Sequence, residues 1–162
     1  MSHQRVNMTN IAMIGCGTIG ISWTAYFLSR GLHVTAFDPD ANARAQFTQR
    51  VAEDMRALGA EARTPVVAQT LAEALEGVEL VVENAPESVS LKQQLLADIQ
   101  QAAPSQALVV SSTSSLKHSD ITKGAPAPER IIIAHPFNPP HLVPLVELYG
   151  PETELVERLV DF

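Results

Sequence analysis

Two residues twelve positions apart, His135 and Glu147, carry the side chains of this chain best suited to acid–base chemistry. His135 follows an apolar run at residues 131–134, and Glu147 lies inside a second apolar run at residues 145–148. A buried carboxylate is costly without a partner, and the imidazole of His135 is the nearest candidate. Such a pair suits alcohol oxidation, because the imidazole takes the hydroxyl proton while the carboxylate orients the ring. The alternative is that His135 is a structural histidine at the end of a strand.

Glycine spacing near the start of the chain predicts a dinucleotide site. Gly15, Gly17 and Gly20 form the pattern G-x-G-x-x-G between an apolar run and a segment with helical spacing. In such a unit the first glycine makes a tight turn, the second lets the backbone approach a pyrophosphate, and the third lets helix and strand pack closely. The N-terminus of the helix adds unpaired N–H groups and partial positive charge. The alternative is a glycine-rich turn that binds flavin or nothing.

An acid at the end of the next apolar run, Asp38, predicts which dinucleotide is preferred. A carboxylate at this position accepts hydrogen bonds from a ribose 2′-hydroxyl and repels a 2′-phosphate. We therefore expect NAD to be preferred over NADP. The single cysteine, Cys16, lies between two of the glycines. A thiol at a helix N-terminus can have a lowered pKa, so a reactive role is conceivable, and the simpler interpretation is a tolerated variable residue.

Strands that alternate with helices are predicted to position these residues. Strands are predicted at residues 11–14, in a segment ending at 38, and at residues 66–68, 78–82, 107–110, 131–134 and 145–148. Pro144 is expected to keep the last of them at an edge or turn position. Helical spacing of apolar residues recurs between them. The alternation predicts an α/β fold with a doubly wound parallel sheet, that is, one Rossmann dinucleotide-binding domain over residues 10–162. Residues 1–9 carry no pattern and are expected to form a loose arm.

Special and polar residues gather where the predicted strands end. They are Gly15, Asp38, residues 85–87, residues 112–114 and His135. Ligands of open parallel sheets bind at the carboxyl ends of the strands. We therefore expect these residues to share one edge of the sheet.

Composition narrows the class of protein. The chain has 162 residues, of which 46% are hydrophobic and 18% charged, which is ordinary for one soluble domain. A net charge of -7 without any Lys/Arg cluster argues against nucleic acid or an anionic membrane as partner. One cysteine excludes an internal disulfide, and the first residues lack a secretory signal. We expect a cytoplasmic protein and predict no metal site.

Four blocks of sequence together resemble the NAD-binding domain of L-3-hydroxyacyl-CoA dehydrogenases. The blocks are residues 15–20, residues 81–87 with Lys92, residues 112–116, and residues 135–139 with residues 145–147. They occur in the order of the family and span most of residues 10–162. The resemblance implies fatty acid metabolism and oxidation of a 3-hydroxy group to a 3-oxo group.

The same resemblance implies roles for individual residues. His135 would be the catalytic base and Glu147 its orienting acid, while Ser114 and Asn138 would hydrogen-bond the reacting oxygen or the neighbouring carbonyl. NAD would lie along Gly15, Gly17, Thr18, Ile19, Gly20, Asp38, Ala85, Glu87, Lys92 and Ser112. Chemically, Lys92 could supply positive charge to an anionic ligand, or it could form an ion pair with Glu87.

Departures from the family pattern leave the substrate open. The family usually has asparagine at the position of Ser112 and an aromatic residue at that of Pro136. Members that use CoA carry a longer helical excursion after the second strand, where this chain has one helix. With residues 83–87 and 135–139 as they stand, the chain more closely resembles shorter relatives that oxidise free 3-hydroxy acids such as L-carnitine and L-gulonate. The candidate functions are a 3-hydroxyacyl-CoA dehydrogenase, a dehydrogenase of a free 3-hydroxy acid, and a non-catalytic NAD-binding or structural module.

The end of the chain resembles an incomplete element. Residues 155–162 have the spacing of an amphipathic helix without a cap. In the family, a further strand and a helical second domain follow, and that domain completes the substrate cleft and most of the dimer interface. We therefore expect a fragment that lacks the helical domain and turns over poorly alone. The parent is expected to be a homodimer that acts on a small molecule.

Overall fold

A seven-stranded sheet forms the centre of the computed structural model, which describes residues 8–160 and 162. Its order is β3-β2-β1-β4-β5-β6-β7. The strands are β1 (Asn10–Ile14), β2 (His33–Phe37), β3 (Val66–Val67), β4 (Leu80–Glu83), β5 (Leu108–Ser111), β6 (Ile131–Pro136) and β7 (Val146–Tyr149). The helices are α1 (Thr18–Ser29), α2 (Ala41–Ala57), α3 (Leu71–Ala74), α4 (Val89–Ala102), α5 (His118–Ile121), the 3-10 helix η1 (Pro128–Arg130) and α6 (Thr153–Val160).

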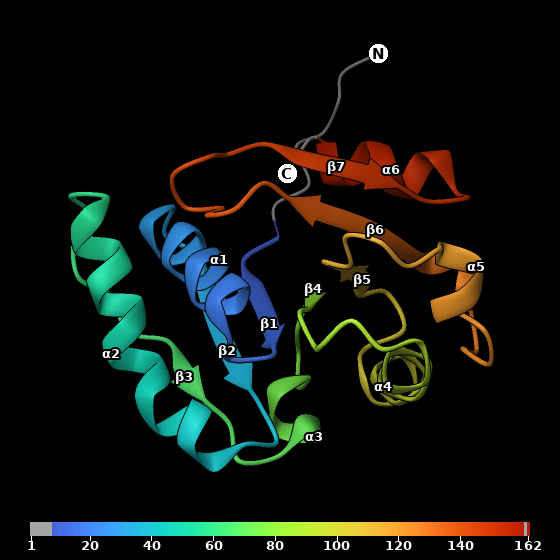
Figure 1. Cartoon of the computed structure of the whole chain (residues 1–162), viewed down its shortest axis with the longest axis horizontal. Helices are drawn as coiled ribbons and strands as arrows, with labels where there is room; N and C mark the ends of the chain where they lie inside the picture. Colours follow the sequence, from blue (N-terminus) through green and yellow to red (C-terminus); the bar gives the residue numbers. More distant parts are fainter. Residues whose placement is uncertain (1–7, 161) are drawn as a thin grey trace.

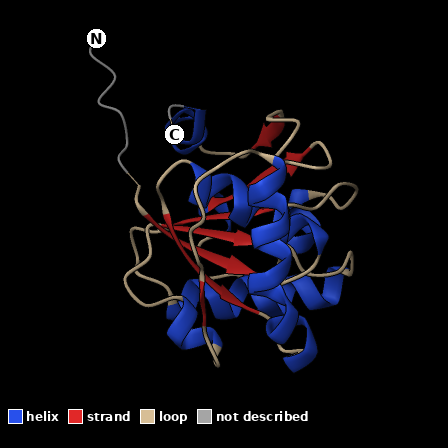
Figure 2. Cartoon of the chain, turned by 90° about the vertical axis from the view of Figure 1, so that its left-hand side faces the viewer, coloured by secondary structure: helices blue, strands red, loops and turns tan. Residues whose placement is uncertain are grey.

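Helices cover both faces of the sheet (Figures 1 and 2). The side chains of each strand alternate between two apolar clusters, as the period of two in a strand requires. In β1, Met13 packs with α1 and α2, whereas Ile14 packs with α3, α4 and α5. The predicted α/β fold with a doubly wound sheet is confirmed. Its strand order reverses between β1 and β4, and a crevice for ligands is expected at that point.

The last strand departs from the prediction of a parallel sheet. Strands β1 to β6 pair in parallel, but β7 runs antiparallel to β6 at the edge of the sheet. The physical reason is the short connection at residues 137–145, because a parallel crossover needs a dozen or more residues. The antiparallel register places His135 directly opposite Glu147.

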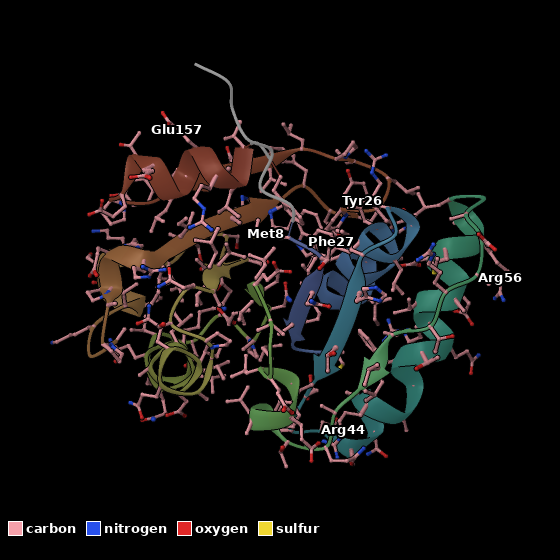
Figure 3. The ribbon with its side chains drawn as sticks, turned by 180° about the vertical axis from the view of Figure 1, so that it is seen from behind. Met8, Tyr26, Phe27, Arg44, Arg56 and Glu157 are labelled. Atoms are coloured by element: carbon pink, nitrogen blue, oxygen red, sulfur yellow. The ribbon has the colours of Figure 1, made fainter. Side chains whose placement is uncertain are left out.

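Residues 1–7 of the predicted loose arm lie outside the described residues. Met8 is only 3% exposed, and it shares the lining of an apolar cavity with Tyr26 and Phe27 (Figure 3). The backbone N–H of Thr9 donates a hydrogen bond to the Glu79 carboxylate at 2.8 Å. The packed part of the chain therefore includes Met8 and Thr9. Among the described helices, none has the length and apolar character needed to cross a bilayer.

Candidate active site

A cavity of about 280 Å³ lies at the carboxyl edge of the sheet. It brings together eight residues that the sequence had singled out, namely Ile19, Ala85, Glu87, Lys92, Ser112, Ser114, His135 and Asn138. A neighbouring cavity of about 240 Å³ is lined by Glu147 and also by Ser114 and His135. The His135 ring therefore borders both cavities. Residues from the ends of β4, β5 and β6 meet here, as the positions of the strand ends predicted.

The glycine turn beside this cavity has the shape that a dinucleotide needs. Gly15 has a φ of 102°, and a Cβ added there would lie 2.9 Å from the carbonyl oxygen of Asn84. A Cβ added at Gly20 would overlap the carbonyl oxygen of Gly15. A Cβ at Gly17 would meet nothing within 4 Å, so the backbone there is open to an approaching ligand. Thr18 follows as the first residue of α1.

Asp38 ties the end of β2 to this turn. Its carboxylate accepts hydrogen bonds from the backbone N–H of Cys16 at 2.8 Å and from that of Asp40 at 2.9 Å. The carboxylate therefore lies beside the glycine turn. This position is compatible with the ribose-binding role that the sequence predicted.

The environment of Cys16 contradicts the idea of a reactive thiol. Burial, together with the negative charge of Asp38, raises the pKa of Cys16 from 9.0 to about 12, although Arg44 acts in the opposite direction. The side chain is only 2% exposed. The lowered pKa that a helix N-terminus can produce is therefore outweighed here.

We expect iodoacetamide at pH ~8 to alkylate native Cys16 at least about tenfold more slowly than the same residue in the urea-unfolded chain. Thiolate is the reactive species, and native Cys16 is both buried and protonated at this pH. Mass spectrometry follows the reaction cleanly because the chain has one cysteine. Equal rates for the native and unfolded chains would contradict this description of the thiol.

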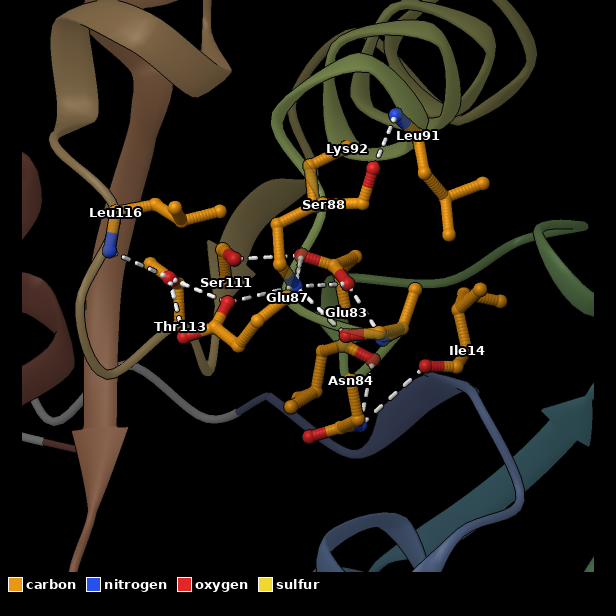
Figure 4. A network of polar contacts seen from close by, with 12 residues as sticks. Ile14, Glu83, Asn84, Glu87, Ser88, Leu91, Lys92, Ser111, Thr113 and Leu116 are labelled. Carbon is orange, nitrogen blue, oxygen red and sulfur yellow. Dashed lines mark hydrogen bonds and ion pairs between the residues drawn. The ribbon is translucent and has the colours of Figure 1, made fainter.

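Lys92 forms a buried ion pair that the sequence analysis did not identify. Its Nζ lies 2.8 and 3.0 Å from the carboxylate oxygens of Glu83 and 2.9 Å from the carbonyl oxygen of Ala85. Glu87 is farther away, at 3.9 Å. Both side chains of the Lys92–Glu83 pair are buried, and Glu83 also accepts hydrogen bonds from Ser111 and from the backbone of Ala85 (Figure 4). The predicted ion pair with Glu87 is thus secondary, and the charge of Lys92 is balanced inside the protein.

Glu87 holds the turn that carries Ser114. Its carboxylate accepts hydrogen bonds from the Thr113 hydroxyl at 2.8 and 2.9 Å, from the Ser114 backbone N–H at 2.7 Å and from the Ser114 hydroxyl at 3.0 Å. Burial acts to raise the pKa of Glu87, but these hydrogen bonds and the charge of Lys92 outweigh it, so the pKa lies below its ordinary value. Glu87 is therefore ionised at neutral pH and fixes Ser114 at the cavity.

The imidazole of His135 is paired with Glu147. Nδ1 of His135 lies 2.9 Å from Oε2 of Glu147, across the antiparallel pair β6 and β7. The His135 side chain is 31% exposed and that of Glu147 is 68% exposed. The expectation of a buried acid is therefore wrong, because β7 is an edge strand and Glu147 lies on its exposed side. A paired Nδ1 leaves Nε2 as the nitrogen available for proton transfer.

Two further residues that line the cavity each have a buried polar atom without a hydrogen-bond partner among the described residues. These atoms are Oδ1 of Asn84 and Oγ of Ser112. Buried polar atoms in native proteins are generally paired, so these are positions for ligand or water contacts. Together with the open backbone at Gly17, they fit a dinucleotide. The sequence analysis did not name Asn84 as a site residue. Its position directly after a buried strand could have indicated such a role.

Comparison with known proteins agrees with this geometry. Residues 10–162 match the family described as 3-hydroxyacyl-CoA dehydrogenase, NAD binding domain. L-carnitine dehydrogenase of Nocardiopsis dassonvillei is 42% identical over an alignment of 149 residues, and the match covers 88% of this chain and 45% of that protein. L-carnitine dehydrogenase of Streptomyces coelicolor is 39% identical over an alignment of 153 residues, and the match covers 90% of this chain and 48% of that protein. The chain spans about half the length of these curated relatives.

Solved structures show the same fold. 3-Hydroxybutyryl-CoA dehydrogenase of Escherichia coli K12 superimposes with a TM-score of 0.84 at 27% identity, covering 95% of this chain and 35% of that chain. The NAD+-dependent 5-formyl-3-hydroxy-2-methylpyridine 4-carboxylic acid 5-dehydrogenase has a TM-score of 0.81 at 30% identity, covering 95% of this chain and 53% of that chain. The predicted resemblance is thereby confirmed, with NAD rather than flavin as the cofactor. The chain belongs to the 3-hydroxyacyl-CoA dehydrogenase family, as its NAD-binding domain.

Proposed function

We propose that this chain is the NAD-binding part of a longer dehydrogenase that oxidises a 3-hydroxy group to a 3-oxo group, with His135 as its base. The observation that carries the proposal is the 2.9 Å contact between His135 and Glu147, made by an imidazole that borders the same cavity as Ile19 and Ala85. A histidine with only a structural role would not have to border that cavity. A base for alcohol oxidation must border it.

The residues divide the chemistry between them. Nε2 of His135 accepts the proton of the substrate hydroxyl, while Nδ1–H donates to Glu147, whose negative charge stabilises the imidazolium that forms. NAD, when bound, would accept the hydride that leaves the carbon bearing this hydroxyl. Ser114 and Asn138 line the cavity and hydrogen-bond the substrate oxygen in this proposal. Glu87 acts through Ser114, because its carboxylate holds both the backbone and the hydroxyl of that residue.

Two kinds of substrate are compatible with this chemistry. The family reaction uses a 3-hydroxyacyl-CoA thioester. A free 3-hydroxy acid such as L-carnitine or L-gulonate is the second candidate, favoured by the names of the relatives and by α2, which is a single helix over Ala41–Ala57. We propose in addition a cytoplasmic homodimer that binds neither nucleic acid nor membrane, in keeping with the net charge of -7.

A substrate panel tests the proposed function. We expect the full-length protein with NAD to oxidise at least one of 3-hydroxybutyryl-CoA, L-carnitine and L-gulonate, with NADH formation followed by absorbance. Activity confined to the thioester selects the CoA class, and activity confined to a free acid selects the second class. Tight NAD binding with no turnover of any 3-hydroxy compound would instead support a non-catalytic NAD-binding module.

A further inference from the structure

A positively charged side chain, that of Arg44, lies next to Asp38, the residue expected to determine the preference for NAD over NADP. Arg44 lies in the first turns of α2, beside the end of β2 (Figure 3). Its Nη1 donates hydrogen bonds to the backbone carbonyl oxygens of Asp38 and of Pro39, the latter at 3.2 Å. The guanidinium carbon lies 5.9 Å from the centre of the Phe37 ring. These three contacts fix the arginine head group at the tip of the strand that ends in Asp38.

The guanidinium keeps donors available for a ligand. An arginine carries five N–H donors in a planar fork. Both of its hydrogen bonds to described residues use Nη1. Nε and Nη2 therefore remain for an anion, and an arginine near this strand end is the usual partner of a 2′-phosphate. The charge also reaches the glycine turn, since Arg44 opposes the effect of Asp38 on the Cys16 thiol.

Asp38 and Arg44 thus act in opposite directions on the same part of a dinucleotide. The carboxylate favours a 2′-hydroxyl and repels a 2′-phosphate, whereas the guanidinium attracts the phosphate. We propose that Arg44 is a second specificity-determining residue and forms a latent 2′-phosphate site that Asp38 keeps closed. The proposal rests on the NAD site of the proposed function and adds a residue that the family resemblance did not assign.

Binding titrations with four variants test this proposal. Asp38→Asn keeps the size of the side chain and an acceptor for the Cys16 N–H, but removes the charge. We expect Asp38→Asn to bind NADPH at least about tenfold more tightly than the unchanged protein, because a charge-assisted contact then acts unopposed. Adding Arg44→Gln should abolish that gain. Adding Arg56→Gln, at the other end of α2, removes the same charge and should leave the gain intact (Figure 3).

Two controls keep the outcomes distinct. Thermal melting shows that each variant is folded. Asp38→Asn with Arg44→Lys preserves a positive charge but loses the planar fork, so it should retain part of the gain. A gain in NADPH affinity that survives Arg44→Gln would overturn the role of Arg44. No gain in Asp38→Asn, with NAD still bound, would overturn it too but leave the proposed function standing. An unchanged protein that binds neither dinucleotide would overturn both.

Discussion

Replacing His135 by glutamine is expected to lower the turnover of the full-length protein by a factor of about 10² to 10⁴. Glutamine has similar length and can still donate a hydrogen bond to Glu147, but it cannot take a proton from the substrate. The affinity for NAD should remain nearly unchanged, because the glycine turn and Asp38 are untouched. Steady-state kinetics with the substrate found in the panel, together with a NAD titration, measures both quantities.

His33→Gln is the matched control for this prediction. His33 is exposed at the start of β2, at the opposite end of the strand from Asp38. Its replacement should change neither turnover nor NAD affinity. Glu147→Gln should lower turnover to a smaller extent than His135→Gln, since it leaves the base in place but weakens its orientation. A His135→Gln protein that turns over as fast as the unchanged one would remove His135 from the mechanism.

The two glycine positions Gly17 and Gly20 should respond differently to alanine. In Gly20→Ala the new methyl group overlaps the carbonyl oxygen of Gly15, so backbone must shift, and we expect a loss of about 3 kcal/mol or more in the free energy of unfolding. Gly17→Ala has room for the methyl group and a φ of -78° that alanine accepts. Its cost should be at most about 1 kcal/mol, the difference between glycine and alanine at an N-cap.

Affinity for NAD should fall in both variants, so stability is the quantity that separates them. Although Gly17→Ala stays folded, its methyl group fills the space through which the backbone approaches a pyrophosphate, so NAD should bind at least about tenfold more weakly. Gly20→Ala should lose both stability and binding. Urea denaturation and NAD titration of each variant provide the measurements. Normal NAD affinity in Gly17→Ala would mean that the pyrophosphate does not approach this turn.

Local signals explain which parts could be predicted from the sequence. Only one helix and one strand separate the glycine turn from Asp38. Their spacing in the sequence was therefore enough to predict that they lie side by side. Strand positions were correct within one or two residues: β4 was expected at residues 78–82 and occupies Leu80–Glu83. His135 was expected just after its strand and lies inside β6, which continues to Pro136.

Partners chosen in three dimensions could not be predicted in the same way. A glutamate that ends an apolar strand does not reveal which cation neutralises it, and only the path from β4 into α4 brings Lys92 rather than another group to Glu83. Pro144 correctly indicated an edge position for the last strand, but the apolar run at residues 145–148 does not indicate that the side chain of Glu147 is exposed. Arg44 had no recognisable signal, because it lies between Ala43 and Ala45 at the start of a helix and belongs to no motif.

The rate of hydride transfer in a single turnover tests the central claim most directly. The full-length protein with saturating NAD and substrate is mixed rapidly, and NADH formation is followed in the unchanged protein and in His135→Gln across a range of pH. If His135 is the base, hydride transfer in the variant should be slow at neutral pH. Its rate should rise steadily with pH, because hydroxide then replaces the missing imidazole as proton acceptor. Equal rates for the two proteins at neutral pH would contradict the claim that His135 takes the proton.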